Sequence, residues 1–157
     1  IRVNDDTIRV LNIHLQSINL RQRNYEFIGN LKIRYSEEQI AGFRDIGSHL
    51  KHAFIQRAEQ AEVISNYIKQ SPYPVILMGD FNDTPVSYAY RKIRKDMNDA
   101  FRKSGKGFGN TYSGKFPSFR IDFILYSDQF KSAEFKRTKN KYSDHYPIQS
   151  LLYLNSE

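Results

Sequence analysis

A long amphipathic segment lies between two apolar segments, and this order constrains the fold more than any other feature. Over residues 40–68 apolar side chains recur at three- and four-residue spacing, which predicts a helix that ends before Pro72. The preceding Ser36-Glu37-Glu38-Gln39 matches a capping box. Residues 7–15 predict a mostly buried strand, and residues 74–78 predict a strand buried on both faces. The order strand, helix, strand indicates an α/β layered domain.

Weaker patterns complete the predicted architecture. Residues 21–30 lie in a polar stretch and predict a short helix, and residues 86–95 predict another. Three further strands are expected over residues 121–126, 133–137 and 148–154. The glycines at 105, 107 and 109 predict a flexible loop, which is not a phosphate-binding P-loop because the lysine and hydroxyl spacing is absent.

Composition narrows the class of protein. The 157 residues suit one domain, which we assign to residues 1–157. Lysine and arginine total 24 against 17 aspartates and glutamates, and the net charge of +7 fits an anionic partner. No cysteine is present, which excludes a thiolate nucleophile and Cys-ligated zinc and leaves the compartment open. No apolar run reaches the roughly 20 residues of a membrane span.

Polar residues gather at strand ends or within strands. They are His14 with Gln16 and Ser17, Asp80 with Asn82, Asp122, and Asp144 with His145. In α/β sheets, ligand sites form beyond the carboxyl ends of strands. Hard oxygen ligands and imidazoles without thiolates favour Mg²⁺ or Mn²⁺ over structural zinc.

Four sequence blocks carry a resemblance to a known family. In chain order they are NIHLQS, VILMGDFNDTP, RIDFILY and YSDHYPI. Together they resemble the signatures of the endonuclease/exonuclease/phosphatase superfamily, the deoxyribonuclease-like, metal-dependent phosphoesterases. The resemblance implies a two-sheet α/β sandwich with its active site at one edge, which cleaves phosphoester bonds with a divalent metal, usually magnesium.

The resemblance also implies roles for individual residues. Asp80 corresponds to the carboxylate that positions or deprotonates the attacking water and contacts metal, and Asn82 to an amide that orients this carboxylate or binds the phosphate. Asp144 corresponds to a metal-linked carboxylate.

Two histidines correspond to imidazoles that contact the scissile phosphate. They are His145, which the resemblance pairs with a hydrogen-bonding carboxylate at Asp122, and His14. Two alternatives stay open: Asp122 forms a structural ion pair with Arg120, or His14 is only a packed strand residue.

Other charged groups have simpler interpretations. His49 and His52 lie three apart on the predicted helix and favour a solvated face, because no third ligand is near. Lys92, Arg94, Lys95 and the basic run over residues 136–141 either guide a polyanionic substrate or only raise solubility.

The resemblance covers the carboxyl-terminal portion of the family domain, with its amino-terminal portion absent. Complete members have about 250 residues or more, and the start at Ile1 fits a piece of a longer protein. The family's main metal-binding glutamate has no match here, since Glu37, Glu38 and Glu59 all lie on the predicted helical segment.

These gaps shape the functional expectation. We expect a parent phosphoesterase acting on nucleic acid, an inositol phosphate or a phospholipid head group, and low activity from this part alone. The alternative is a non-catalytic, polyanion-binding module of the same fold. An uncovered apolar sheet face would favour a homodimer.

Overall fold

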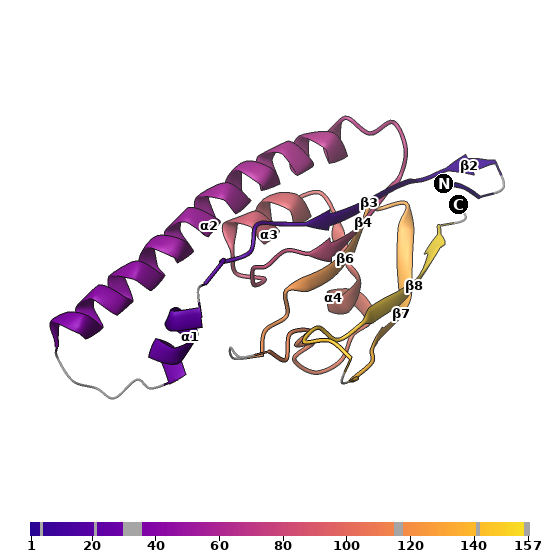
Figure 1. Cartoon of the computed structure of the whole chain (residues 1–157). Helices are drawn as coiled ribbons and strands as arrows, with labels where there is room; N and C mark the ends of the chain where they lie inside the picture. Colours follow the sequence, from indigo (N-terminus) through magenta and orange to yellow (C-terminus); the bar gives the residue numbers. More distant parts are fainter. Residues whose placement is uncertain (4, 21, 30–35, 115–117, 141, 156–157) are drawn as a thin grey trace.

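The computed structural model describes residues 1–157 except 4, 21, 30–35, 115–117, 141 and 156–157 (Figure 1). In chain order the elements are β1 (Arg2–Val3), β2 (Asp6–Thr7), β3 (Arg9–His14), α1 (Gln22–Gly29), α2 (Glu37–Lys69), β4 (Val75–Asp80), α3 (Tyr88–Arg94), β5 (Asn98–Asp99), α4 (Ala100–Ser104), β6 (Asp122–Tyr126), β7 (Phe130–Arg137) and β8 (Ile148–Leu154). The predicted α/β layered architecture is confirmed.

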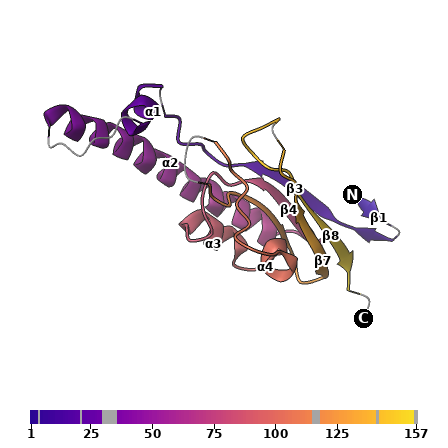
Figure 2. The same cartoon turned by 90° about the horizontal axis from the view of Figure 1, so that it is seen from below.

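A four-stranded sheet in the order β3-β4-β6-β5 forms the centre of the fold. Strands β3 and β4 are parallel because α2 connects them as a crossover, and β6 runs antiparallel to β4. Helices α2 and α3 pack on one face of this sheet (Figures 1 and 2). The two-stranded sheet β7-β8 packs on the opposite face around Ile124 and Tyr126.

Helix α2 begins and ends as the sequence predicts. The Ser36 hydroxyl accepts a hydrogen bond from the Gln39 backbone N–H at 3.3 Å, which caps the first turn. The second half of α2 packs on the sheet through Ala61, Ile64 and Ile68. Its first half extends past the strands toward α1 (Figure 1). None of the described helices has the length and apolarity that a membrane crossing requires.

A short helix was expected over residues 21–30, and α1 confirms it over residues 22–29. Its Phe27 ring meets the Phe43 ring of α2 edge to face, with centroids 5.2 Å apart. Arg23 and Asn24 donate hydrogen bonds to the Asp45 carboxylate at 3.0 and 2.9 Å. These contacts hold α1 against the half of α2 that lies beyond the sheet.

One prediction about the core is wrong. Strand β4 is fully buried on one face, where Val75 and Leu77 contact the helices, but Met78 on the other face is 37% exposed. The cause is that β7-β8 covers only part of that face, packing near Ile76. A continuous apolar run therefore lies on a sheet that is covered unequally. A homodimer through the exposed part stays a prediction.

The structure contains elements around the glycine-rich loop and β6 that the sequence did not predict. Helix α4 and the short strand β5 precede the predicted loop, and β7 begins at Phe130, before the expected start at residue 133. The Asp99 carboxylate caps α4 by accepting a hydrogen bond from the Phe101 N–H at 2.9 Å. Only five residues of helix follow, too few to leave a clear apolar period.

Replacing Asp99 with Ala should lower the free energy of unfolding by about 3 kcal/mol or more. The carboxylate is 1% exposed and accepts hydrogen bonds from Arg120 at 2.7 Å and from the Tyr90 hydroxyl at 2.6 Å. Its loss would leave the buried Arg120 guanidinium without its counter-charge. Urea unfolding measures the change. The exposed Asp96→Ala serves as control, and equal effects of the two variants would contradict the argument.

Candidate active site

Three polar side chains lie side by side on neighbouring strands. His14 ends β3, Asp80 ends β4 and Asp122 begins β6, and the strand register pairs His14 with Asp80 and Asp80 with Asp122. Because side chains directly opposite each other in paired strands point to the same face, all three point away from α2. The sheet alone therefore brings together residues that are 66 and 42 positions apart in the sequence.

Asn82 joins the ends of β3 and β4. Its backbone has φ 49°, a left-handed conformation that asparagine tolerates better than most residues, and its N–H donates to Asp80 Oδ1 at 2.7 Å. Its side-chain nitrogen lies 3.1 Å from Asp80 Oδ2, 3.0 Å from the Leu15 carbonyl oxygen and 3.1 Å from His14 Nε2. These contacts hold the Asp80 carboxylate and the His14 imidazole in fixed relative positions.

His145 comes from the segment between β7 and β8 and reaches the same place. Its Nδ1 lies 2.9 Å from Asp122 Oδ2, and its Nε2 lies 3.9 Å from Asp80 Oδ2. A proton on Nδ1 donates to the Asp122 carboxylate, so the pair fixes the ring and directs Nε2 toward Asp80. The Tyr112 ring packs edge to face on the imidazole at 5.3 Å between centroids.

The groups around Asp80 shift the pKa of its carboxyl in opposing directions. Burial raises the pKa of the Asp80 carboxyl, and the nearby Asp122 carboxylate raises it further. The Asn82 N–H and the imidazoles of His145 and His14 act in the opposite direction. The balance is a raised pKa of the Asp80 carboxyl, which reflects first its burial and then the repulsion between the two carboxylates. A bound cation would offset their repulsion.

The site offers ligands for a hard divalent ion. Asp80, Asp122 and His145 each supply one ligand atom, and these atoms all lie within 4.8 Å of one another. The two carboxylates suit Mg²⁺ or Mn²⁺, which complete their coordination with water. The residues present therefore fit such an ion.

The described structure brings five of the six predicted site residues together: His14, Asp80, Asn82, Asp122 and His145. Asp144 lies beside them but is exposed, and its backbone carbonyl accepts a hydrogen bond from the Ser113 N–H at 2.7 Å. Its role as a metal ligand stays a prediction, as do the catalytic roles of the other five.

The contacts decide between the alternatives that the sequence left open for Asp122 and His14. Arg120 pairs with Asp99 at 2.7 Å, whereas Asp122 contacts His145, so the ion pair considered between Arg120 and Asp122 does not form. His14 has a side chain that is 69% exposed and is not a packed strand residue. Among the described residues, the metal-compatible group does not include either histidine of α2.

Two residues that support the site were not identified from the sequence. The Thr111 hydroxyl is buried and accepts hydrogen bonds from the Ile121 and Asp122 N–H groups at 3.0 and 3.1 Å. The backbone of Tyr112 forms an isolated antiparallel β-bridge with His145. Both lie in a segment whose apolar residues show no periodicity. No pattern in the sequence therefore connects them to the four blocks that carry the family resemblance.

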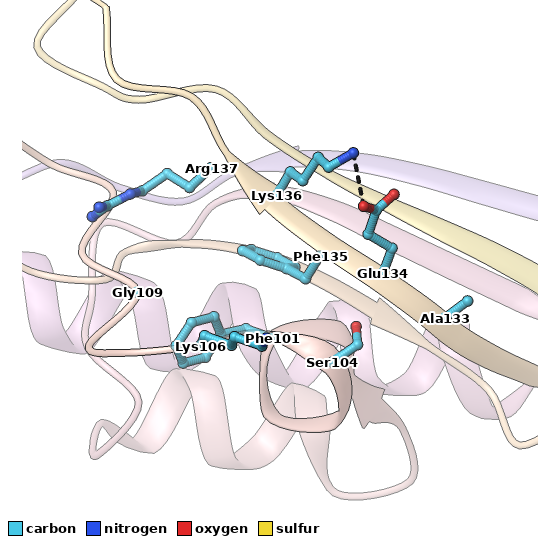
Figure 3. A pocket seen from close by; sticks show the side chains of 9 residues that line it. All are labelled: Phe101, Ser104, Lys106, Gly109, Ala133, Glu134, Phe135, Lys136 and Arg137. Atoms are coloured by element: carbon cyan, nitrogen blue, oxygen red, sulfur yellow. Dashed lines mark ion pairs between the residues drawn. The ribbon is translucent and has the colours of Figure 1, made fainter.

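A separate pocket of about 480 Å³ lies between α4 and β7 and includes part of the basic run (Figure 3). There the Lys136 ammonium pairs with Glu134 at 2.7 Å, and the Arg137 guanidinium donates to the Asn110 carbonyl. Two of the basic residues therefore have structural partners. A role of the run in guiding a polyanion stays a prediction.

A family model and several solved structures match this chain. A family model described as "Endonuclease/Exonuclease/phosphatase family" matches residues 16–145. The chain is similar to the crystal structure of the endonuclease/exonuclease/phosphatase from Bacteroides vulgatus, with 27% identity and a TM-score of 0.56 over 64% of this chain and 44% of that chain. No curated protein matches the sequence.

Two further structures share the fold. One is from an endonuclease/exonuclease/phosphatase family protein of Bacteroides thetaiotaomicron, with 22% identity and a TM-score of 0.57 over 66% of this chain and 46% of that chain. The other is beta toxin from Staphylococcus aureus, with 18% identity and a TM-score of 0.58 over 96% of this chain and 54% of that chain. The chain thus spans about half the length of the structures it matches.

Proposed function

Because the chain belongs to the endonuclease/exonuclease/phosphatase family, we propose that the protein containing it hydrolyses phosphoester bonds with a divalent metal ion, Mg²⁺ or Mn²⁺. The observation that carries the proposal is the convergence of His14, Asp80, Asn82, Asp122 and His145 at one sheet edge. Binding alone would not require a carboxylate aligned behind a histidine. The substrate is a phosphodiester or phosphomonoester.

The two imidazoles would bind the anionic phosphate. Asp122 accepts the Nδ1 proton of His145 and fixes the orientation of the ring, so that an Nε2 proton would donate to a phosphate oxygen. His14, on the other side of Asp80, supplies a second contact. Charge that accumulates on the phosphate oxygens during attack is thereby offset by fixed donors.

Asp80 would act on the attacking water. Its carboxylate is held by Asn82 and faces both imidazoles, so it can accept a proton from a water beside the bound phosphate. The metal ion, when bound, neutralises the anionic ester and lowers the pKa of a coordinated water. Asp80 and Asp122 are the carboxylates that would hold it, and Asp144 remains the predicted further ligand.

Removing the metal tests this proposal. We expect the complete gene product to hydrolyse plasmid DNA, phosphoinositides or sphingomyelin in the presence of Mg²⁺, and EDTA to lower the rate at least about 100-fold. Excess Mg²⁺ should restore it. A rate that EDTA does not change would contradict metal dependence. Binding of these polyanions without hydrolysis would instead favour the non-catalytic module.

A further inference from the structure

An apolar recess of about 580 Å³ opens directly beside the candidate active site. Asn82 and His145 border both the site and the recess. Part of the lining comes from residues 46–57 of α2, and another part comes from the segment around Phe119 and Ile121. A substituent on a phosphate held between the imidazoles could therefore extend directly into the recess.

The walls of the recess are mainly hydrophobic. Apolar side chains come from three separate segments of the chain: Ile18, Leu20, Ile46, Leu50, Phe54 and Phe119. Phe54 and Phe119 are 50% and 45% exposed, so large apolar surfaces face the solvent at this place. Exposed apolar area that is concave and borders a polar site is typical of a ligand-binding surface.

The guanidinium group in the lining is already paired. Arg57 is 1% exposed, and it donates hydrogen bonds to Asp83 Oδ2 at 3.0 Å and to the Gln16 carbonyl at 2.9 Å. Its charge is therefore compensated within the protein. A nucleic acid would bring further phosphates that need cationic partners, and a paired arginine offers little to them.

We propose that this recess binds an apolar group esterified to the substrate phosphate, so that the preferred substrate is a phosphodiester with an alkyl or acyl chain. This inference rests on the proposed hydrolysis and adds the substrate class. The phosphate lies between His14 and His145, and the chain extends along Leu50 and Phe119. Burial of the chain supplies binding energy that the open polar site alone lacks.

A series of 4-nitrophenyl alkyl phosphates, from methyl to octyl, tests the recess in the complete gene product with Mg²⁺. All esters are used below their critical micelle concentrations. We expect kcat/KM to rise up to about fourfold for each of the first methylenes, because each buried methylene is withdrawn from water. Leu50→Gln and Phe119→Gln should flatten this dependence on chain length. Phe108→Gln, 92% exposed and outside the recess lining, should preserve it.

Two outcomes would overturn the inference while leaving the proposed function intact. They are hydrolysis that does not depend on chain length and faster cleavage of a thymidine dinucleotide than of the octyl ester. If neither these esters nor the phosphoesters that test the proposed function are cleaved, the proposed function fails instead. Calorimetric titration with octyl and methyl methylphosphonate then still tests the recess, since equal affinities would contradict it.

Discussion

Asp80→Asn should lower the rate of phosphoester hydrolysis by the complete protein at least about 100-fold. Asparagine keeps the shape of the side chain but cannot accept the proton of an attacking water. It also removes a negative charge from the group that would hold the metal ion. The loss should appear mainly in kcat, because the proposed contacts of His14 and His145 with the phosphate would be retained.

The assay needs variants that separate chemistry from folding. His145→Ala should lose a comparable factor, since it removes the donor that Asp122 orients at 2.9 Å. Asp96→Asn makes the same chemical change on an exposed aspartate away from the site and should retain full activity. Circular dichroism checks that each variant is folded. If Asp80→Asn and His145→Ala each keep more than a tenth of the rate, the catalytic assignments are wrong.

The sequence predicted the segments of the site better than their mutual contacts. Apolar runs located β3, β4 and β6, but periodicity does not fix the order of strands in a sheet. The alignment of His14, Asp80 and Asp122 depends on the register of three strands, which long-range packing determines. Only the family resemblance suggested that Asp122 meets His145. The residue types alone left Arg120 open as an alternative partner.

Coverage of the sheet was harder still to predict. Residues 74–78 are uniformly apolar, yet Met78 is 37% exposed, because coverage depends on where β7-β8 lies and not on β4 itself. The recess poses the same difficulty. Leu50, Phe54 and Phe119 look like ordinary core residues in the sequence, yet all three line the recess, where α2 meets the segment around Phe119.

Gly79 lies in the GDFN block for a physical reason that its turn propensity does not explain. It has φ +146°, a conformation that side chains disfavour, and it pairs with Ile13 across the parallel strands β3 and β4. A Cβ atom at this position would lie 1.8 Å from the Ile13 carbonyl oxygen. The obstacle is backbone and not a side chain, so it cannot rotate away.

Gly79→Ala should therefore lower the free energy of unfolding by more than about 4 kcal/mol, a large part of the stability of most domains. The strands must separate to admit the methyl group, which breaks their hydrogen bonds and displaces Asp80 next in sequence. Gly47→Ala is the matched control. Nothing lies within 4 Å of its Cβ position in α2, so alanine should stabilise the helix by about 0.5–1 kcal/mol. Thermal and urea unfolding of the two variants should shift in opposite directions, and a Gly79→Ala variant as stable as the parent would disprove the close approach of β3 and β4 at this point.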